Sequence, residues 1–237
     1  MARKLTDIAQ KIHHSTDRFS QHLRDHQSED IMDFLDRLSQ SHAVYLFSGI
    51  IRDFFLRYRE KTRDLDIMVE GDEKMLENLL KSYDYQKNSF DGYKVRVGEG
   101  MIDIWHIQKT WALTHGQTVM DFGLHTYIPH TAFFNFSSII YDYNDKKFHF
   151  TIHFLRFLRD RHIDIVYQPN PNIPLCIVNT FYYNSKYKLR IAPRLGRFIR
   201  QNYPKYIGKY EAVQEKHFGE VIFGEEEILK LIMGRLD

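Results

Sequence analysis

A chain of 237 residues is long enough for one large domain or for a domain and a half. Hydrophobic side chains make up 43% and charged ones 27%, as is ordinary for a globular protein, and the net charge of +2 excludes a general polycation. The single cysteine excludes an intramolecular disulfide and a multi-cysteine zinc site. No apolar run has the length of a membrane span and no signal-peptide core is visible, so we expect a cytoplasmic protein that needs no membrane.

Residues 1–43 are expected to form helices that pack on the domain that follows. Leu5, Ile8 and Ile12 have the spacing of one helical face. Ser28 precedes two acids and then an amphipathic segment, which is the pattern of an N-cap followed by an acidic first turn. These helices lead into an apolar run that is typical of a strand.

The stretch 44–71 carries the clearest functional pattern. Its apolar run ends at Ser48-Gly49, and an amphipathic segment typical of a helix follows. A turn of this kind before a helix offers backbone N–H groups and a positive dipole end to a phosphate. Asp64 and Asp66 then alternate with apolar residues, so a strand would place both carboxylates on one face. Because neighbouring carboxylates repel each other, a divalent cation between them would stabilise this arrangement.

A second alternating region follows. The segments 94–97 and 101–105 flank a Gly-Glu-Gly turn and predict a β-hairpin. Asp103 stands between two isoleucines, so its carboxylate should project from the face opposite to them. Between the two acid-bearing regions, Asp72 is a suitable N-cap for a further amphipathic helix.

The order of these features resembles the nucleotidyltransferase superfamily of DNA polymerase β. It is most similar to the head domain of CCA-adding enzymes and bacterial poly(A) polymerases. That family carries a Gly-Gly or Gly-Ser turn, a helix with an Arg-Asp pair, and Asp-x-Asp on the next strand. The resemblance implies an α+β nucleotidyltransferase fold, in which helices flank a mixed β-sheet and a small helical neck domain follows. The matching residues are Ser48-Gly49, Arg52-Asp53, and Asp64 with Asp66.

The resemblance also implies a domain organisation. The head domain would occupy 44–168, with the N-terminal helices packed on it, and a helical neck-like domain would occupy 175–237. The proline-punctuated segment 168–174 between them is the clearest boundary signal in the chain. Ahead of it, 148–161 predicts a short helix with exposed arginines, and 162–167 predicts a short strand.

The same resemblance assigns roles to the acids. The superfamily needs a third carboxylate on a strand beside Asp-x-Asp, and Asp103 lies where it is expected, with Asp121 and Asp142 as alternatives. Asp64, Asp66 and Asp103 would hold two Mg²⁺ ions, and Asp103 would draw the proton from the attacking hydroxyl. The residues that bind the triphosphate of the NTP would be Ser48, Gly49 and Arg52.

The chain departs from the family where the incoming base is read. The segment that closes the family's head domain matches through its apolar end, but its two arginines and its acid are replaced. The Glu-Asp pair and the two arginines of the neck helix are replaced as well. A site without them has no reason to select C and then A, which argues against a housekeeping CCA-adding enzyme. The replacing residues are Thr131, Ala132, Phe133, Asn172, Ile173, Cys176 and Asn179.

The C-terminal part carries basic residues interleaved with tyrosines. Such a patch is suited to an RNA backbone and to base stacking, whereas the alternative is a solvated helix face. The basic residues are Lys186, Lys188, Arg190, Arg194, Arg197, Arg200, Lys205 and Lys209. The tyrosines are Tyr183, Tyr187, Tyr203, Tyr206 and Tyr210.

Two functions from different classes follow. The first is a metal-dependent nucleotidyltransferase that moves an NMP from an NTP to an acceptor hydroxyl and releases pyrophosphate, with an RNA 3′ end as the best candidate acceptor. Small members of the superfamily also include defence proteins and toxins with antitoxin-like protein partners. The second is a nucleotide-binding or interaction module with weakened catalysis. Retention of three aspartates argues against the second, since a like-charge cluster without metal costs stability.

Overall fold

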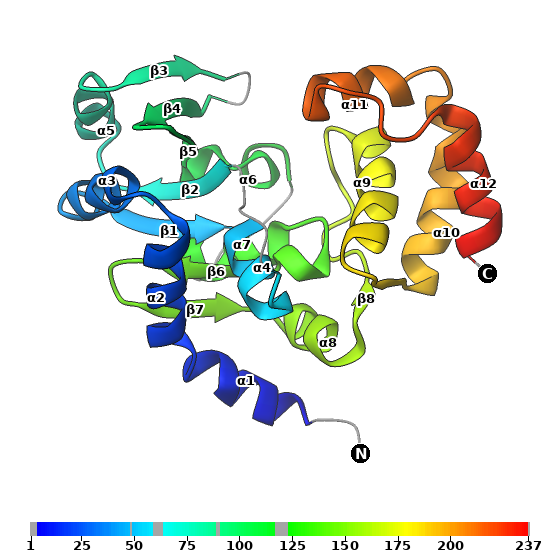
Figure 1. The fold of residues 1–237 in the computed structure, drawn as a ribbon, viewed down its shortest axis with the longest axis horizontal. Coiled ribbons are helices and arrows are strands. Elements are labelled where there is room, and N and C mark those ends of the chain that lie inside the picture. Colours follow the sequence, from blue (N-terminus) through cyan, green and yellow to red (C-terminus); the bar gives the residue numbers. More distant parts are fainter. Residues whose placement is uncertain (1–3, 48, 59–63, 89–90, 117–122, 237) are drawn as a thin grey trace. The chain divides into compact units, whose positions relative to one another are not determined.

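The computed structural model describes residues 4–47, 49–58, 64–88, 91–116 and 123–236. Contacts divide the chain into two compact units (Figure 1). Unit 1 comprises Met1–Ala132 and Phe136–Arg159, and unit 2 comprises Phe133–Asn135 and Asp160–Asp237. Every helix in these described ranges is too short or too polar to cross a membrane.

Unit 1 is built on a seven-stranded sheet. Its strands are β1 (Ala43–Phe47), β2 (Asp64–Glu70), β3 (Asp84–Lys87), β4 (Tyr93–Val97), β5 (Gly100–His106), β6 (Ile139–Asp142) and β7 (Lys147–Phe150). They lie in the order β3-β4-β5-β2-β1-β6-β7. β2 and β5 run parallel, and the other neighbours are antiparallel. The mixed sheet that the sequence predicted is confirmed, and the two parallel strands are the predicted carriers of the acids.

The helices predicted after Ser28 and after Asp72 start where the sequence indicated. The predicted N-caps are confirmed: the side chain of Ser28 accepts a hydrogen bond from the backbone N–H of Ile31, and Asp72 accepts one from Met75. The α-helices are α1 (Leu5–His13), α2 (Thr16–His26), α3 (Glu29–Ser39), α4 (Gly49–Leu56), α5 (Glu73–Leu80), α6 (Trp111–His115), α7 (Leu124–Thr131) and α8 (Ile152–Asp160). The short 3-10 helices are η1 (Ile107–Lys109) and η2 (Asn135–Ser137).

One predicted helix begins later than expected. The sequence indicated a helix over 148–161, but residues up to Phe150 form β7, and α8 starts at Ile152. β7 pairs with β6, and Phe148 is buried opposite Tyr141. β6 and β7 form an antiparallel hairpin across a short turn, and this cross-strand pairing overrides the helical pattern of the segment. The arginines of the segment are exposed, as predicted.

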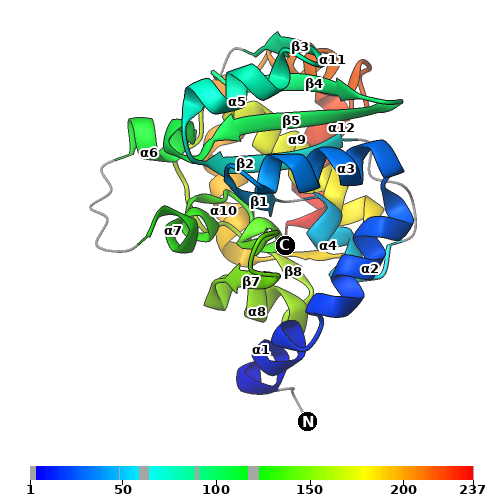
Figure 2. The same ribbon diagram turned by 90° about the vertical axis from the view of Figure 1, so that its left-hand side faces the viewer.

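Helices α2 to α5 cover one face of the sheet with a core rich in rings. Phe19 of α2 contacts Phe54 of α4 and the strand residues Tyr141 and Phe148 edge-on. α3 and α5 cover the same face further along (Figure 2). The hydroxyl of Tyr93 in β4 donates to Glu77 of α5 at 2.9 Å. This face therefore carries a layer of packed helices, with a cavity of about 610 Å³ between α2, α3 and Tyr141.

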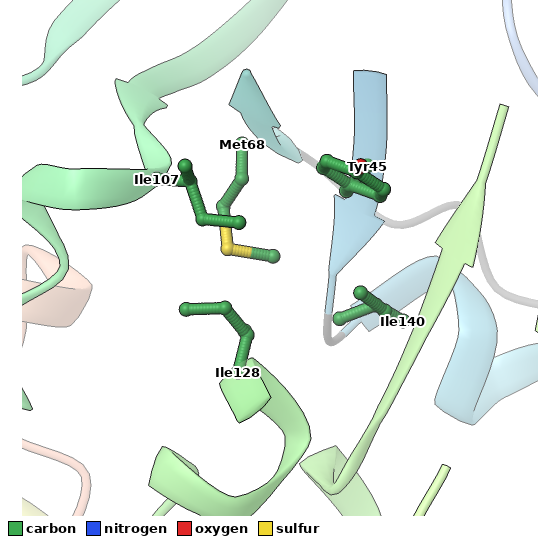
Figure 3. Close-up of a cluster of buried hydrophobic side chains, with 5 residues drawn as sticks. All are labelled: Tyr45, Met68, Ile107, Ile128 and Ile140. Atoms are coloured by element: carbon green, nitrogen blue, oxygen red, sulfur yellow. The ribbon is translucent and has the colours of Figure 1, made fainter. Parts of the chain in front are cut away.

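On the opposite face, the described residues of η1 and α7 cover one part of the sheet. Tyr45, Met68 and Ile140 project from β1, β2 and β6 and pack against Ile107 and Ile128, which come from η1 and α7 (Figure 3). All five side chains are at most 3% exposed. We call these five residues the covered patch.

Unit 2 is mostly helical. Its elements are β8 (His162–Ile163), α9 (Ile173–Lys186), β9 (Arg190–Ile191), α10 (Pro193–Asn202), η3 (Tyr203–Tyr206), α11 (Tyr210–Phe218) and α12 (Glu225–Arg235). β8 pairs in parallel with β9. This pairing explains why unit 2 begins at Asp160, ahead of the segment 168–174. Buried Gln214 accepts hydrogen bonds from the backbone N–H groups of Ile222 and Phe223, which fixes the loop before α12.

Candidate active site

Two predicted carboxylates are direct neighbours. In the parallel pair of β2 and β5, Asp66 lies opposite Asp103. Residues opposite each other in a parallel pair project from the same face, so both side chains leave the sheet together. The flanking residues Ile102 and Ile104 are fully buried on the helix-covered face. The predicted orientation of Asp103 away from them follows from this register.

The neighbours of these acids form a line across four strands. Lys94 of β4 lies opposite Asp103, and Phe47 of β1 lies opposite Asp66. We call Lys94, Asp103, Asp66 and Phe47 the acid row. Lys94 Nζ is 4.0 Å from Asp103 Oδ2, and the side chain of Asp103 is 29% exposed. The acid row thus changes from cationic, through acidic, to apolar along the sheet.

The backbone of the third predicted ligand also lies in this region. Asp64 is the first residue of β2 and pairs with Met101. Its side chain lies outside the described residues. In the described part of the chain, no group of three or more His, Cys, Asp or Glu side chains could hold a metal ion. The pair of Asp66 and Asp103 nevertheless offers carboxylate oxygens, which are the donors that Mg²⁺ prefers, so the chemistry of these residues fits that ion.

The start of α4 lies beside the acid row. Gly49 is the first residue of α4 and follows Phe47 by two positions, and Phe47 is the neighbour of Asp66. The first backbone N–H groups of a helix have no partner within the helix and carry the positive end of its dipole. This helix start is therefore suited to an anion near Asp66. Ser48, the other residue of the predicted turn, lies outside the described residues.

Arg52 forms a buried ion pair. Its Nε donates to Asp53 Oδ1 at 3.0 Å, and the two side chains are 7% and 5% exposed. The guanidinium also lies over the ring of Phe136, with 5.5 Å between Cζ and the ring centroid. These contacts fix the first turns of α4 in place, and the predicted contact of Arg52 with a triphosphate stays a prediction.

An apolar wall borders the acids. Trp105 follows Asp103 by two residues on the same face of β5, and its ring meets that of Phe47 edge-on at 6.2 Å. Both rings pack against the covered patch. The acids therefore lie where the covered patch ends, next to an apolar surface whose low dielectric constant strengthens local electrostatic interactions.

The two alternative carboxylates are placed differently. Asp121 lies outside the described residues. Asp142 is buried at the end of β6, opposite Tyr45, where its Oδ1 accepts a hydrogen bond from the backbone N–H of Asp145 at 3.0 Å. Its Oδ2 is 4.0 Å from Nε2 of His149. Asp142 thus belongs to a cluster at the other end of β1 rather than to the acid row.

That cluster was not predicted from the sequence. His125 stacks on Tyr45 at 5.5 Å and meets His149 edge-on at 4.9 Å, beside a cavity of about 430 Å³. Burial lowers the pKa of His149, and the neighbouring His125 and Lys147 lower it further. Burial raises the pKa of Tyr45, with Asp142 adding to the effect. The residues of this cluster come from separate parts of the sequence, so no local sequence pattern indicates the cluster.

The C-terminal basic-aromatic stretch divides into exposed and buried members. Tyr203 and Tyr210 are 7% and 0% exposed and stack on each other at 5.1 Å, so these two tyrosines are core residues and not base-stacking platforms. Lys186 lies over the rings of Tyr182 and Tyr187. The exposed basic residues of the stretch are Lys188, Arg190, Arg194, Arg197, Arg200, Lys205 and Lys209.

Solved structures with this arrangement of elements are known. A CCA-adding enzyme in complex with ATP matches with a TM-score of 0.65 and 17% identity, over 89% of this chain and 52% of that chain. The Thermotoga maritima CCA-adding enzyme complexed with tRNA matches with a TM-score of 0.61 and 18% identity, over 90% and 53%. The chain has the fold of the CCA-adding enzymes.

A tRNA nucleotidyltransferase complexed with a primer tRNA and an incoming ATP analogue agrees, with a TM-score of 0.60 and 16% identity, over 85% of this chain and 60% of that one. The chain therefore spans between one half and three fifths of the length of these structures. No protein-family model matches the chain, and no curated protein matches it. The fold predicted from the turn, the helix and the alternating acids is thus confirmed by structural similarity.

Proposed function

We propose that the protein is a nucleotidyltransferase that moves an NMP from an NTP to an acceptor hydroxyl at an RNA 3′ end. The observation that carries this proposal is the direct pairing of Asp66 with Asp103 beside the start of α4. The fold adds support, because similar structures are described as complexes with ATP, CTP and tRNA. A pair of half-buried carboxylates beside a helix start is suited to phosphate chemistry with a divalent cation.

The reaction is a displacement at the α-phosphorus of the NTP. The acceptor oxygen forms a bond to that phosphorus, the bond to the bridging oxygen of the β-phosphate breaks, and pyrophosphate leaves. Asp103 accepts the proton of the acceptor hydroxyl. Asp66, Asp103 and Asp64 would hold Mg²⁺, which when bound neutralises charge on the phosphates. Positioning and charge neutralisation supply most of the catalysis.

The start of α4 would bind the triphosphate. The first backbone N–H groups of α4, from Gly49 onward, point out of the N-terminal end of the helix. This end directly follows Phe47 of the acid row in the chain. Ser48 and Arg52 complete the proposed triphosphate contacts. The buried pair with Asp53 holds the backbone of this turn and orients the helix start toward the substrate.

The choice of nucleotide is proposed to differ from C followed by A. Two arginines that read the base in CCA-adding enzymes correspond to Cys176 and Asn179 here. Cys176 is 7% exposed, and burial raises the pKa of its thiol to about 12, so it is a neutral apolar group. A neutral thiol and an amide cannot reproduce the donors of two guanidinium groups.

The experiment measures NMP incorporation into an RNA oligonucleotide from each of the four α-labelled NTPs, with Mg²⁺, together with released pyrophosphate. Asp66→Asn and Asp103→Asn should each lower the rate at least about a hundredfold, because each removes charge stabilisation at the reacting phosphate. Asp142→Asn is the matched control, since it changes a buried carboxylate on the same sheet face away from the acid row, and it should keep the activity. Unchanged rates in the first two variants would refute the assignment.

A binding module without turnover is the second candidate. The observation that favours it is the loss of the family's basic groups at Thr131 and Ala132. A thermal shift with Mg²⁺ and each NTP, with and without RNA, separates the two functions. Stabilisation by an NTP without released pyrophosphate supports the module, whereas stabilisation with turnover supports the enzyme.

A further inference from the structure

One end of the acid row continues into an exposed polar surface. β4 alternates the buried residues Tyr93, Val95 and Val97 with the exposed residues Lys94 and Arg96. The buried set faces α3 and α5, and the exposed set shares the face of Asp66 and Asp103. This alternation leaves two cations on the open side of the sheet, on the strand next to Asp103.

The register fixes where these cations lie. Lys94 is opposite Asp103, and Arg96 is opposite Met101, which pairs in turn with Asp64. On the outer side, Gln86 and Asp84 of β3 lie opposite Lys94 and Arg96 and are exposed as well. Two residues of one strand face lie about 6.6 Å apart, which is close to the spacing of successive phosphates in an extended nucleic-acid strand.

The charge pairs on this surface are weak. Arg96 Nε is 3.6 Å from Asp84 Oδ2, and these side chains are 58% and 76% exposed. Lys94 is 47% exposed and 4.0 Å from Asp103. The pair of Arg96 and Asp84 is exposed and contributes little to stability, and the side chain of Lys94 is itself exposed, so both cations are accessible to phosphate groups.

The two phosphate-binding elements flank the acids from opposite sides. The order across the sheet is β4, β5, β2, β1, and α4 follows β1. The start of α4 thus lies beyond Asp66, and Lys94 lies beyond Asp103. In-line phosphoryl transfer needs the attacking and leaving oxygens on opposite sides of the phosphorus. A triphosphate at α4 therefore leaves the β4 side for the acceptor.

We propose that Lys94 and Arg96 bind the phosphate backbone of the acceptor RNA and place its 3′ hydroxyl beside Asp103. Gln86 contributes a neutral hydrogen-bonding group on the same surface. This inference rests on the proposed nucleotidyltransferase function and names the surface that its acceptor uses. The contacts are to phosphates, so they position the strand and do not read its sequence.

The test is the affinity for a fluorescent single-stranded RNA oligonucleotide, measured by anisotropy at several salt concentrations without NTP or Mg²⁺. Lys94→Gln and Arg96→Gln should each weaken binding about threefold, and the double variant about tenfold. The double variant should also lower the slope of log Kd against log salt concentration by about 1.4, since two phosphate contacts are lost. Melting temperatures of the variants verify that the fold is retained.

Lys87→Gln is the matched control. Lys87 is an exposed lysine of β3, but it pairs with Tyr93 and lies over the Tyr93 ring, on the helix-covered face. Its removal changes the net charge equally and should leave RNA affinity within about twofold of wild type. An equal loss for Lys87→Gln and Lys94→Gln would contradict a specific surface, as would unchanged affinity in the double variant or a wild type without affinity for the RNA.

The outcome is separable from that of the proposed function. If the wild type transfers NMP but the double variant binds RNA unchanged, the acceptor surface is refuted and the nucleotidyltransferase function stands. If no NTP yields NMP transfer, the proposed function is refuted, and the acceptor role of Lys94 and Arg96 is refuted with it. Loss of RNA affinity together with unchanged thermal stabilisation by an NTP supports the acceptor assignment.

Discussion

The two halves of one sheet face have opposite characters. On β1, β2 and β6 the covered patch buries Tyr45, Met68 and Ile140 under η1 and α7. On β2, β5 and β4 the same face carries Asp66, Asp103 and the exposed cations Lys94 and Arg96. The change takes place within single strands, because Met68 follows Asp66 by two residues in β2. An apolar half thus fixes the strands, and a neighbouring polar half is left for chemistry.

The difference lies in where charge is tolerated. Two adjacent carboxylates on the open half remain in contact with water, so their repulsion costs little and a cation can relieve it. On the covered half, a single unsatisfied polar group would carry a full desolvation cost. Substitutions should therefore affect stability on the covered side and chemistry on the open side.

The largest loss of stability is expected where a charge is buried. Asp53→Asn removes the anion beside the buried guanidinium of Arg52 and should lower the free energy of unfolding by about 3–5 kcal/mol. Asp103→Asn makes the same chemical change on the open half and should alter it by less than about 0.5 kcal/mol. Urea denaturation measures the free energy of unfolding of both variants. Equal losses of stability would contradict the accessibility of Asp103 to water.

The covered patch should respond to lost volume. Ile128→Ala removes buried methyl groups that pack on Met68 and Ile140, and it should lower the free energy of unfolding by about 2–5 kcal/mol. Met75 of α5 is 51% exposed, so Met75→Ala is a control of similar size with little expected effect. Thermal unfolding gives the melting temperatures of the two variants. An equal fall in both would contradict the packing assigned to the covered patch.

A smaller effect is expected from pH. Burial lowers the pKa of His149 below its ordinary value of 6.5, so the unfolded chain binds this proton more tightly than the folded one. Stability should fall as pH decreases below 6.5, by at most about 1.4 kcal/mol per pH unit for this histidine. His149→Gln should reduce this dependence of stability on pH. Part of the dependence should remain in the variant, because the pKa of His22 is also lowered. Urea denaturation midpoints between pH 5 and 7 measure this dependence in the wild type and in His149→Gln. Identical slopes in the two proteins would contradict the role of His149.

The local patterns predicted most of the fold and part of the site. The alternation around Asp66 and Asp103 and the caps at Ser28 and Asp72 depend on neighbours in sequence, so they are visible without a structure. The cross-strand neighbour of Asp103 could also be predicted from the sequence. Val97 pairs with Gly100 across the hairpin turn, and counting back along both strands from this pair places Lys94 opposite Asp103.

Other features depend on contacts between distant residues. The burial of Tyr203 and Tyr210 depends on how they pack in unit 2, and an interleaved basic-aromatic pattern does not distinguish core rings from exposed ones. The same holds for Phe133–Asn135, which joins unit 2 through contacts with the chain beyond Asp160.

The most direct test of the account is metal binding at the acid row. Mn²⁺, which is detected by electron paramagnetic resonance, replaces Mg²⁺ in a titration of the protein with a non-hydrolysable NTP analogue. The account predicts that Asp66→Asn and Asp103→Asn each lose at least one bound Mn²⁺, whereas Asp142→Asn binds as the wild type does. Equal Mn²⁺ binding by the wild type, Asp66→Asn and Asp103→Asn would contradict it.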